Sequence, residues 1–323
     1  MTEVVWQPSC ELEQLQQRAK MLTLIRRFFS ERDVLEVETP LLSQATGTEP
    51  QLDFFSSEYH RHPESQTLFL QTSPEFAMKR LLAAGSGSIY QICKAFRNGE
   101  SGRFHNPEFT ILEWYRVDFN LQKLMNEVAE LLSAVLSISS VKKISYSELF
   151  FQKTGLNALE YSPKTYQAYA LSQNIPDAVT LCEDNHDLWL DFIFSHKIQA
   201  TLSENSIYLV YGYPASQASL ARINIDNPAI ADRFEVFVNG IELANGFFEL
   251  ANATEQASRF EQEINFRREN KRPSVVKDSR FLAALNAGLP DCSGVAIGLD
   301  SLLMLLTASS TIDDVIAFPV NRA

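Results

Sequence analysis

Cysteine is scarce and scattered in this chain of 323 residues. Its four thiols, at Cys10, Cys93, Cys182 and Cys292, form no C-x-x-C pair and have no histidine at ligand spacing. Structural metal sites and disulfide frameworks depend on such spacings, so the sequence argues against both. We expect four buried free thiols.

The chain also lacks an apolar run of the roughly 20 residues that a membrane-spanning helix needs. Its most apolar stretch covers residues 295–308, and Asp300 interrupts it. The first six residues hold no basic segment followed by an apolar core, as a signal peptide would. We therefore expect a cytoplasmic protein with no membrane contact.

Positive charge is in deficit. The 28 lysine and arginine residues face 40 acidic ones, which gives a formal net charge of -12. Non-specific binding to nucleic acids depends on cations that neutralise phosphates, so this balance argues against it and weakly favours a basic partner. No G-x-G-x-x-G motif follows a strand and no G-x-x-x-x-G-K-[ST] motif occurs, which leaves Rossmann and P-loop nucleotide sites unsupported.

What is present is an ordinary globular composition, with 45% apolar and 21% charged residues. Apolar residues recur at helical spacing over residues 11–32 and 121–136, which predicts two helices, and a charged helix is predicted at 254–271. Two β-rich runs, 89–97 and 109–117, flank a polar loop and predict a long hairpin. Further strands are predicted at 34–39, 207–210, 234–238, 241–247 and 292–297, and further helices at 73–82, 188–202 and 299–306.

The order of these elements predicts the fold class. Strands joined by hairpins, with helices in blocks, indicate an α+β fold in which a mainly antiparallel sheet is flanked by helices. The Asn239-Gly240 pair between two of the strands is a strong turn signal. We expect a single domain over residues 1–323, with a helical insertion at about 137–205.

The return strand of the long hairpin carries polar groups on one face. A period of two places Phe109, Ile111, Glu113 and Tyr115 together. An aromatic ring, a carboxylate and a phenol make a poor core and a good floor for a ligand. A solvated sheet face is the alternative that the spacing alone leaves open.

This hairpin is similar to motif two of the class II aminoacyl-tRNA synthetases, and other segments narrow the resemblance to the lysyl-tRNA synthetases. Residues 28–40 resemble motif one, a helix and strand that end in proline, and residues 294–300 resemble motif three. The other similar segments are 72–75 with 79–82, 104–110 with 113–115, and 242–249. Together the segments follow the family's order and span about residues 21–306.

The resemblance implies a class II synthetase-like catalytic domain that forms a homodimer through motif one. Lysyl-tRNA synthetases carry an N-terminal OB-fold that reads the anticodon, and we expect none here because motif one begins within the first thirty residues. Residues 213–221 and 315–323 look like the paralogues that lack this domain and join lysine or (R)-β-lysine to elongation factor P. This implies ATP as a substrate, Mg²⁺ as cofactor, elongation factor P as partner, and no tRNA.

Site residues follow from the same resemblance. Arg97 is implied as the catalytic residue, because its fork of donors suits the α-phosphate of ATP, and Phe109 as a stacking face for adenine. The other implied ATP-binding residues are Asn98, Gly99, Glu100, His105, Asn106, Glu242, Leu243, Gly298 and Ser301. Implied amino-acid-binding residues are Ser73, Pro74, Glu75, Glu113, Tyr115, Glu249 and Ala296. Glu242 and Glu249 are implied as Mg²⁺ ligands, with solvated surface charges as the alternative.

Four positions depart from the family pattern. Gly99 stands where motif two has glutamate, Ser301 where motif three has arginine, and Phe248 where a small polar residue or histidine is usual. Ala296 replaces a glycine, and its methyl group either reshapes the pocket towards a β-amino acid or only packs the strand. Gly99 and Ser301 leave open a pseudoenzyme that binds without turnover. A truncated synthetase that acts on RNA is the second alternative, and the acidic charge argues against it.

Overall fold

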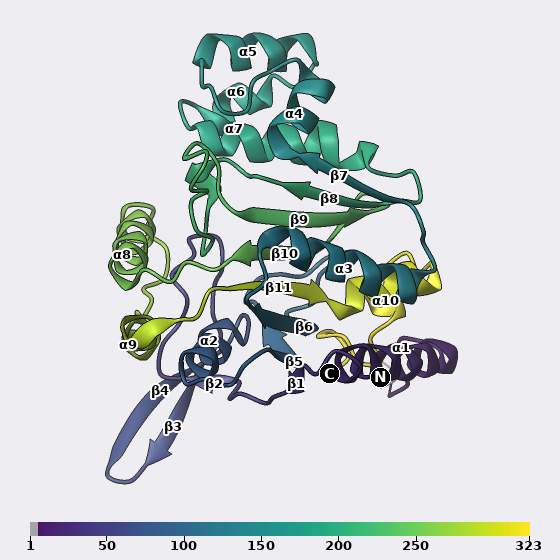
Figure 1. Ribbon diagram of the computed structural model, residues 1–323, viewed down its shortest axis with the longest axis vertical. Helices are drawn as coiled ribbons and strands as arrows, with labels where there is room; N and C mark the ends of the chain where they lie inside the picture. The colour runs from purple at the N-terminus through teal and green to yellow at the C-terminus, as the bar shows by residue number, and fades with distance from the viewer. Residues whose placement is uncertain (1–5) are drawn as a thin grey trace, which may run out of the picture. The chain divides into compact units, whose positions relative to one another are not determined.

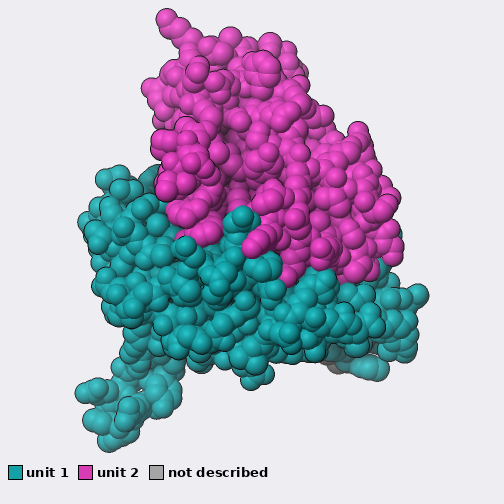
Figure 2. All heavy atoms as spheres, viewed as in Figure 1, with its two compact units in different colours: residues 1–120, 250–323 teal, residues 121–249 magenta. Residues whose placement is uncertain are grey.

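The computed structural model describes residues 6–323. Residues 1–5, on which the expected lack of a signal peptide partly rests, lie outside the described part. The chain divides into two compact units, one formed by residues 1–120 and 250–323 and the other by residues 121–249 (Figure 2). We refer to them as unit 1 and unit 2 and describe each by itself.

Unit 1 is built on four sheet strands in the order β1 (Leu35–Glu36), β5 (Ile89–Phe96), β6 (Glu108–Val117) and β11 (Cys292–Gly298) (Figure 1). β5 and β6 form the predicted hairpin, and β11 pairs with β6 antiparallel, whereas β1 runs parallel to β5. Every residue of β6 between Ile111 and Tyr115 is buried. β6 is therefore the central strand of this part of the sheet.

The helix α1 (Leu12–Ser30) covers one face of these strands. Its buried side chains include Phe28 and Phe29, and the ring of Phe29 stacks on Tyr90 of β5 at 4.4 Å and meets Trp114 of β6 at 5.3 Å. Because side chains alternate along a strand, Glu113 and Tyr115 point to the opposite face. The packing of α1 thus assigns the polar residues of β6 to the face that α1 leaves uncovered.

The other helices of unit 1 are α2 (Glu75–Ala83), α8 (Ala253–Glu269), α9 (Ser279–Gly288) and α10 (Leu299–Thr307), followed by a 3₁₀ turn at Ile312–Asp314. Phe76 of α2 stacks on Phe281 of α9 at 4.4 Å, which joins these two helices through their apolar faces. A second small sheet contains β2 (Leu42–Ser43), β4 (Glu64–Leu70) and β3 (Ser56–Arg61). Its β3–β4 hairpin extends away from the rest of unit 1 (Figure 1).

Unit 2 begins with α3 (Leu121–Leu136), whose bounds are those predicted. Its strands lie in the order β10 (Ile241–Phe248), β9 (Arg233–Val238), β8 (Ile207–Tyr211) and β7 (Val141–Ser145), with β7 parallel to β8 and the other pairs antiparallel. Asn239 and Gly240 both have positive φ, 50° and 75°. This is the geometry of the two-residue hairpin turn that the sequence predicts.

Between β7 and β8 the chain is helical. The segment contains α4 (Tyr146–Thr154), α5 (Pro163–Ser172), α6 (Asp177–Cys182) and α7 (His186–Ile193), then a π turn at Phe194–Ile198 and a 3₁₀ turn at Gln199–Thr201; a further 3₁₀ turn, Ala215–Gln217, follows β8. Side chains such as Trp189 and Phe150 are fully buried in its core. The helical character of the predicted insertion is present, although the expected helix at 188–202 is interrupted by these two turns.

The predicted α+β fold is confirmed, and several details differ from the predictions. Of the strand expected at 34–39, only Leu35–Glu36 forms strand β1, and the N–H of Val37 adds a hydrogen bond of 2.9 Å to the carbonyl of Tyr90. The expectation that all four thiols are buried is wrong for Cys93, which is half-buried on β5, whereas the other three are buried. No helix within residues 6–323 is long and apolar enough to cross a membrane.

Candidate active site

The polar face of β6 forms the floor of the candidate site in unit 1. The hydroxyl of Tyr115 donates a hydrogen bond of 2.6 Å to Oε1 of Glu113, and both side chains are 2% exposed. Ala296 of β11 and Gln91 of β5 lie directly opposite Glu113 in the two ladders. Directly opposed residues have Cβ atoms about 5 Å apart, so a methyl group at position 296 lies beside the carboxylate of Glu113.

Two residues of this floor were missed by the sequence analysis. Gln91 accepts a hydrogen bond of 3.0 Å from the hydroxyl of Thr39, and Cys93 lies opposite Ile111. Burial, together with the charge of Glu113, raises the pKa of the Cys93 thiol to about 12. The alternation of β5 could have identified both, because they follow the same period of two as the residues of β6.

Arg97 lies at the end of β5, where the motif-two loop begins. Its backbone N–H donates to the carbonyl of Pro107 at 2.9 Å, and its guanidinium lies 5.0 Å from the centre of the Phe109 ring. Within the described residues, its Nε is buried without a hydrogen-bond partner. A buried donor without a partner is costly, so this atom is suited to an acceptor that a ligand would supply.

The glycine that departs from the motif-two pattern occupies a turn. Gly99 has φ +85°, a conformation that disfavours any residue with a Cβ atom. The turn brings the carboxylate of Glu100 to 3.7 Å from Nη1 of Arg97. Glu100 thereby approaches the arginine although it stands one place later than the glutamate of the family pattern.

The rest of the motif-two loop is held by backbone contacts. The amide nitrogen of Asn106 donates to the Glu108 carbonyl at 2.6 Å, and its amide oxygen accepts from the N–H of Val320 at 3.0 Å. His105 pairs with Gly102 through its backbone, and its side chain is exposed. Asn106 therefore shapes the loop, while its role towards ATP, like that of His105, stays a prediction.

The predicted amino-acid-binding turn precedes α2. The N-cap position of α2 is Pro74 rather than the expected Ser73, whose hydroxyl accepts a hydrogen bond of 3.4 Å from the N–H of Glu75. The carboxylate of Glu75 meets Nζ of Lys79 at 2.6 Å, and Lys79 is 1% exposed. An ammonium group that is this deeply buried needs an anionic partner, and it fixes the direction of the Glu75 side chain.

Motif three crosses from β11 into α10. Gly298 is the N-cap of α10, and the half-buried Ser301 lies in its first turn. The carboxylate of Asp300 accepts hydrogen bonds from the guanidinium of Arg18 and, at 2.6 Å, from the backbone N–H of Thr110. β11 ends with Gly298 opposite Ile111. The carboxylate of Asp300 bonds to the N–H of Thr110, the next residue of β6, and so holds β6 beside Phe109.

Unit 2 carries the remaining predicted residues on β10. A β-bulge lies between Glu242 and Ala244, with the buried Leu243 as the extra residue. Residues seven apart in a regular strand point to opposite faces, but one extra residue reverses the alternation. The bulge therefore places Glu242 and Glu249 on the same face, where the exposed Glu242 and the buried Glu249 were predicted to act together.

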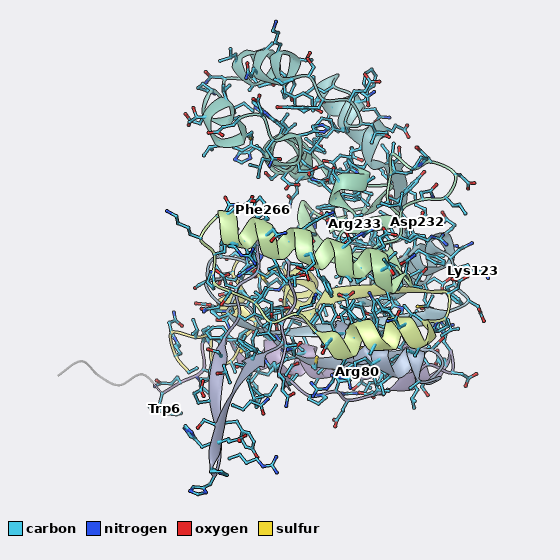
Figure 3. All side chains as sticks on the ribbon, turned by 90° about the vertical axis from the view of Figure 1, so that its left-hand side faces the viewer. Trp6, Arg80, Lys123, Asp232, Arg233 and Phe266 are labelled. Carbon is cyan, nitrogen blue, oxygen red and sulfur yellow. The ribbon has the colours of Figure 1, made fainter. Side chains whose placement is uncertain are left out.

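The same face holds a network of polar side chains, of which Glu235 and Tyr213 are buried and Arg233 and Asn245 half-buried. Arg233 donates to Glu235 at 2.5 Å and to the side chain of Asn245 at 3.3 Å, and Tyr213 donates to Glu235 at 2.6 Å. The charges of Glu235 and Glu242 outweigh the effect of burial and raise the pKa of Arg233. Arg233 lies at the start of β9 beside Asp232 (Figure 3). The sequence alone does not predict Asn245 as part of this face, because the face depends on the bulge.

A metal site formed by the protein alone is absent from the described residues, since no three histidine, cysteine or acidic side chains cluster there. Two carboxylates on one face suit Mg²⁺ nonetheless, because this ion commonly takes one or two carboxylates and completes its shell with substrate phosphates and water. Glu242 and Glu249 thus have the donor atoms and the shared face that the predicted role requires.

Comparison with known proteins identifies the family. Residues 9–322 match the model of the class II tRNA synthetases (D, K and N). The chain belongs to this family. Membership confirms the resemblance drawn from the sequence motifs, and it implies the use of ATP.

The family contains relatives that match almost the whole chain. A protein of Photobacterium profundum named elongation factor P--(R)-beta-lysine ligase is 47% identical over 98% of this chain and 99% of its own length. Proteins with the same name from Vibrio cholerae and Haemophilus ducreyi are 47% and 44% identical, and each covers 100% of this chain. The similarity thus extends over nearly the whole of this chain.

Proposed function

We propose that this chain is an ATP-dependent ligase that activates (R)-β-lysine or lysine as an aminoacyl-adenylate and transfers it to a lysine side chain of elongation factor P. The observation that carries the proposal is the near full-length similarity, at 44–48% identity, to relatives named for this activity. The alternatives of a pseudoenzyme and of a synthetase acting on RNA have no comparable support.

Arg97 would hold the α-phosphate of ATP. Its guanidinium has a buried Nε without a partner among the described residues, beside an aromatic face that adenine can share. An arginine fork recognises phosphate through two parallel charge-assisted hydrogen bonds. We assign Arg97 the stabilisation of charge at the α-phosphate and Phe109 the stacking of adenine. The 98–106 loop would close over the nucleotide, and Gly298 and Ser301 of motif three would bind ATP as well.

The floor of β6 would receive the amino acid. Glu113 and Tyr115 offer a buried carboxylate and a hydroxyl for an ammonium group, and Glu75 offers a second carboxylate, fixed by Lys79. Ala296 adds a methyl group directly beside Glu113. A β-amino acid carries its amine one carbon farther from the carboxylate than an α-amino acid does. The methyl group of Ala296 would favour binding of the β-amino acid by changing the space available to the amine.

Glu242 and Glu249 of unit 2 would hold Mg²⁺, which would neutralise charge on the phosphates of ATP. The bulge in β10 gives the two carboxylates a common face. In the first half-reaction, an oxygen of the amino acid carboxylate attacks the α-phosphorus and pyrophosphate leaves. In the second, the neutral amine of the target lysine attacks the carbonyl of the adenylate and AMP leaves. Positioning and electrostatic stabilisation supply the catalysis, without a nucleophile from the protein.

The proposal also covers the location, oligomeric state, domain organisation and acceptor of the enzyme. We propose a cytoplasmic homodimer formed through residues 22–40, a single catalytic domain with a helical insertion, and a protein rather than tRNA as acceptor. The net charge of -12 favours this acceptor, because binding to a phosphate backbone depends on cationic side chains.

Exchange of labelled pyrophosphate into ATP tests the first half-reaction without elongation factor P. We expect exchange that depends on (R)-β-lysine or lysine, with the higher kcat/KM for (R)-β-lysine, and a loss of about a hundredfold or more in Arg97→Met, which removes the phosphate ligand. Exchange that is absent with both amino acids would contradict the proposal and favour the pseudoenzyme.

A further inference from the structure

Arg267, in the last turn of α8, is a deeply buried cation outside the candidate site of unit 1. Its guanidinium is bonded to several backbone carbonyls. Its side chain is 2% exposed. Nη1 donates to the carbonyls of Glu49 and Leu52, each at 2.9 Å, and Nε donates to the carbonyl of Pro273 at 3.1 Å. These acceptors lie in irregular segments, so Arg267 orders backbone that no strand or helix orders.

The same guanidinium also binds a carboxylate. Nη2 of Arg267 lies 2.8 Å from Oδ1 of Asp53, and Arg272 approaches Oδ2 of Asp53 at 3.8 Å. Only arginine supplies donors in a planar fork that reaches several carbonyls and a carboxylate at once. Arg267 therefore fixes both the path of residues 49–53 and the orientation of Asp53.

Asp53 connects this cluster to motif two. Its carbonyl accepts a hydrogen bond of 2.9 Å from the N–H of Asn98, and the two residues form an isolated β-bridge. The side chain of Asn98 also lies 3.5 Å from the Phe54 carbonyl. Asn98 directly follows Arg97, so the loop that Arg267 orders holds the chain where the predicted phosphate ligand leaves β5.

We propose that Arg267 is a positioning residue for ATP, acting on Arg97 through Asp53 and Asn98. The proposal rests on the proposed function, because it takes Arg97 as the ligand of the α-phosphate. Loss of the Arg267 contacts releases Asn98, and the guanidinium of Arg97 then samples orientations that do not fit the phosphate. The contacts of Arg267 and Asp53 do not reach the floor that would bind the amino acid. That floor is held by the ladders of β5, β6 and β11.

The test is the KM for ATP and for lysine or (R)-β-lysine in pyrophosphate exchange, measured on the full chain. In Arg267→Met we expect the KM for ATP to rise about tenfold or more. The KM for the amino acid should stay within about twofold of the wild-type value. Arg267→Lys keeps the charge but loses the fork and should raise the ATP KM by about three- to tenfold. Arg268→Met, which removes an exposed cation from the same helix turn, is the matched control and should leave both KM values unchanged.

A purely structural role would lower the melting temperature and the active fraction without moving the ATP KM. If Arg267→Met does not fold, Arg267→Lys and Asp53→Asn decide, because both conserve the volume of the site. An unchanged ATP KM in these two variants would overturn the proposal. If the unchanged chain binds no ATP in titration calorimetry, both this proposal and the proposed function fail. If it binds ATP and the variants bind it equally, only the positioning role fails.

Discussion

Ser301 stands where the resemblance to motif three predicts an arginine. A serine hydroxyl in the first turn of α10 offers one neutral hydrogen bond where the family pattern has a guanidinium. Arg103 of the motif-two loop is held by other contacts: its Nε donates to the carbonyl of Ser310 at 2.9 Å, and its guanidinium lies 4.9 Å from the Phe104 ring. The terminal phosphate of ATP is thus expected to meet a weaker partner than an arginine would offer.

We predict that Ser301→Arg strengthens ATP binding. A charge-assisted hydrogen bond exceeds a neutral one by roughly 1–2 kcal/mol, which corresponds to about five- to thirtyfold in affinity. Titration calorimetry on both forms measures the gain, and added salt should reduce it because exposed charges are screened. Ser301→Gln is the control, since it adds length without charge. Equal ATP affinity in the serine and arginine forms would show that another cation, first of all Arg103, already binds the phosphate.

Single residues also show what the sequence could predict about the site. The period of two placed Glu113 and Tyr115 together, and their hydrogen bond of 2.6 Å bears this out. The pairing of Ala296 with Glu113 depends on the register between β6 and β11, strands separated by nearly two hundred residues. A single sequence contains no local signal for such a register, so only the structure brings these two residues side by side.

At the scale of elements, α8 holds the loop between β2 and β3. Besides Arg267, it carries Glu263, whose carboxylate accepts a hydrogen bond from the buried hydroxyl of Thr48. Burial raises the pKa of Glu263 above its usual value, and the hydrogen bond from Thr48 and the charge of Arg259 oppose this only in part. The ionised form of Glu263 is therefore less favourable in the folded chain than in the unfolded one.

This shift predicts how stability depends on pH. When the pKa of a carboxyl group is higher in the folded than in the unfolded chain, the group stabilises the fold at a pH below the unfolded-state pKa. This stabilisation is lost as the pH rises through the folded-state pKa. Glu263→Gln still accepts the bond from Thr48 and should raise the melting temperature by about 1–3 °C at pH 7. Near pH 4 the difference should vanish.

Thermal unfolding of both forms by circular dichroism across pH 4–8 measures the effect. Glu261→Gln, which removes an exposed carboxylate from the same helix, is the control. A melting temperature that falls in Glu263→Gln at pH 7 would mean that the carboxylate contributes favourable contacts as an anion, contrary to the direction of its pKa shift.

Elements with a strong period were predictable, whereas irregular ones were not. The sixteen-residue helix α3 has its predicted bounds because its apolar residues follow a period of 3.6 throughout. The β3–β4 hairpin was missed because all six residues of β3 are exposed, so no alternation of apolar and polar residues marks it. The bulge in β10 was also missed, since its extra residue changes the face of Glu242 and Glu249 without any signal in composition.

At the scale of the whole molecule, apolar side chains near motif one remain exposed. Leu35 and Leu42 are 56% and 46% exposed, on short strands that flank the end of the predicted dimer segment. Exposed apolar groups beside an unpaired strand edge are typical of an interface between copies of a chain.

We predict a homodimer formed through residues 22–40. Sedimentation at micromolar concentration should give about twice the mass of the 36.5 kDa chain. Leu35→Glu places a charge in the expected interface and should weaken the dimer about tenfold or more. Leu171→Glu is the matched control, because Leu171 is 63% exposed on α5 of unit 2. A monomer in the unchanged chain would contradict the role of motif one.

A transfer assay tests the nature of the acceptor most directly. The chain is mixed with ATP and labelled (R)-β-lysine or lysine, in the presence of either elongation factor P or total tRNA, and the acceptor that carries the label is measured. We predict label on elongation factor P, at a lysine side chain, and none on tRNA, because the net charge of -12 disfavours a phosphate backbone. Label that is found on tRNA alone, or on neither acceptor, would contradict the proposed function.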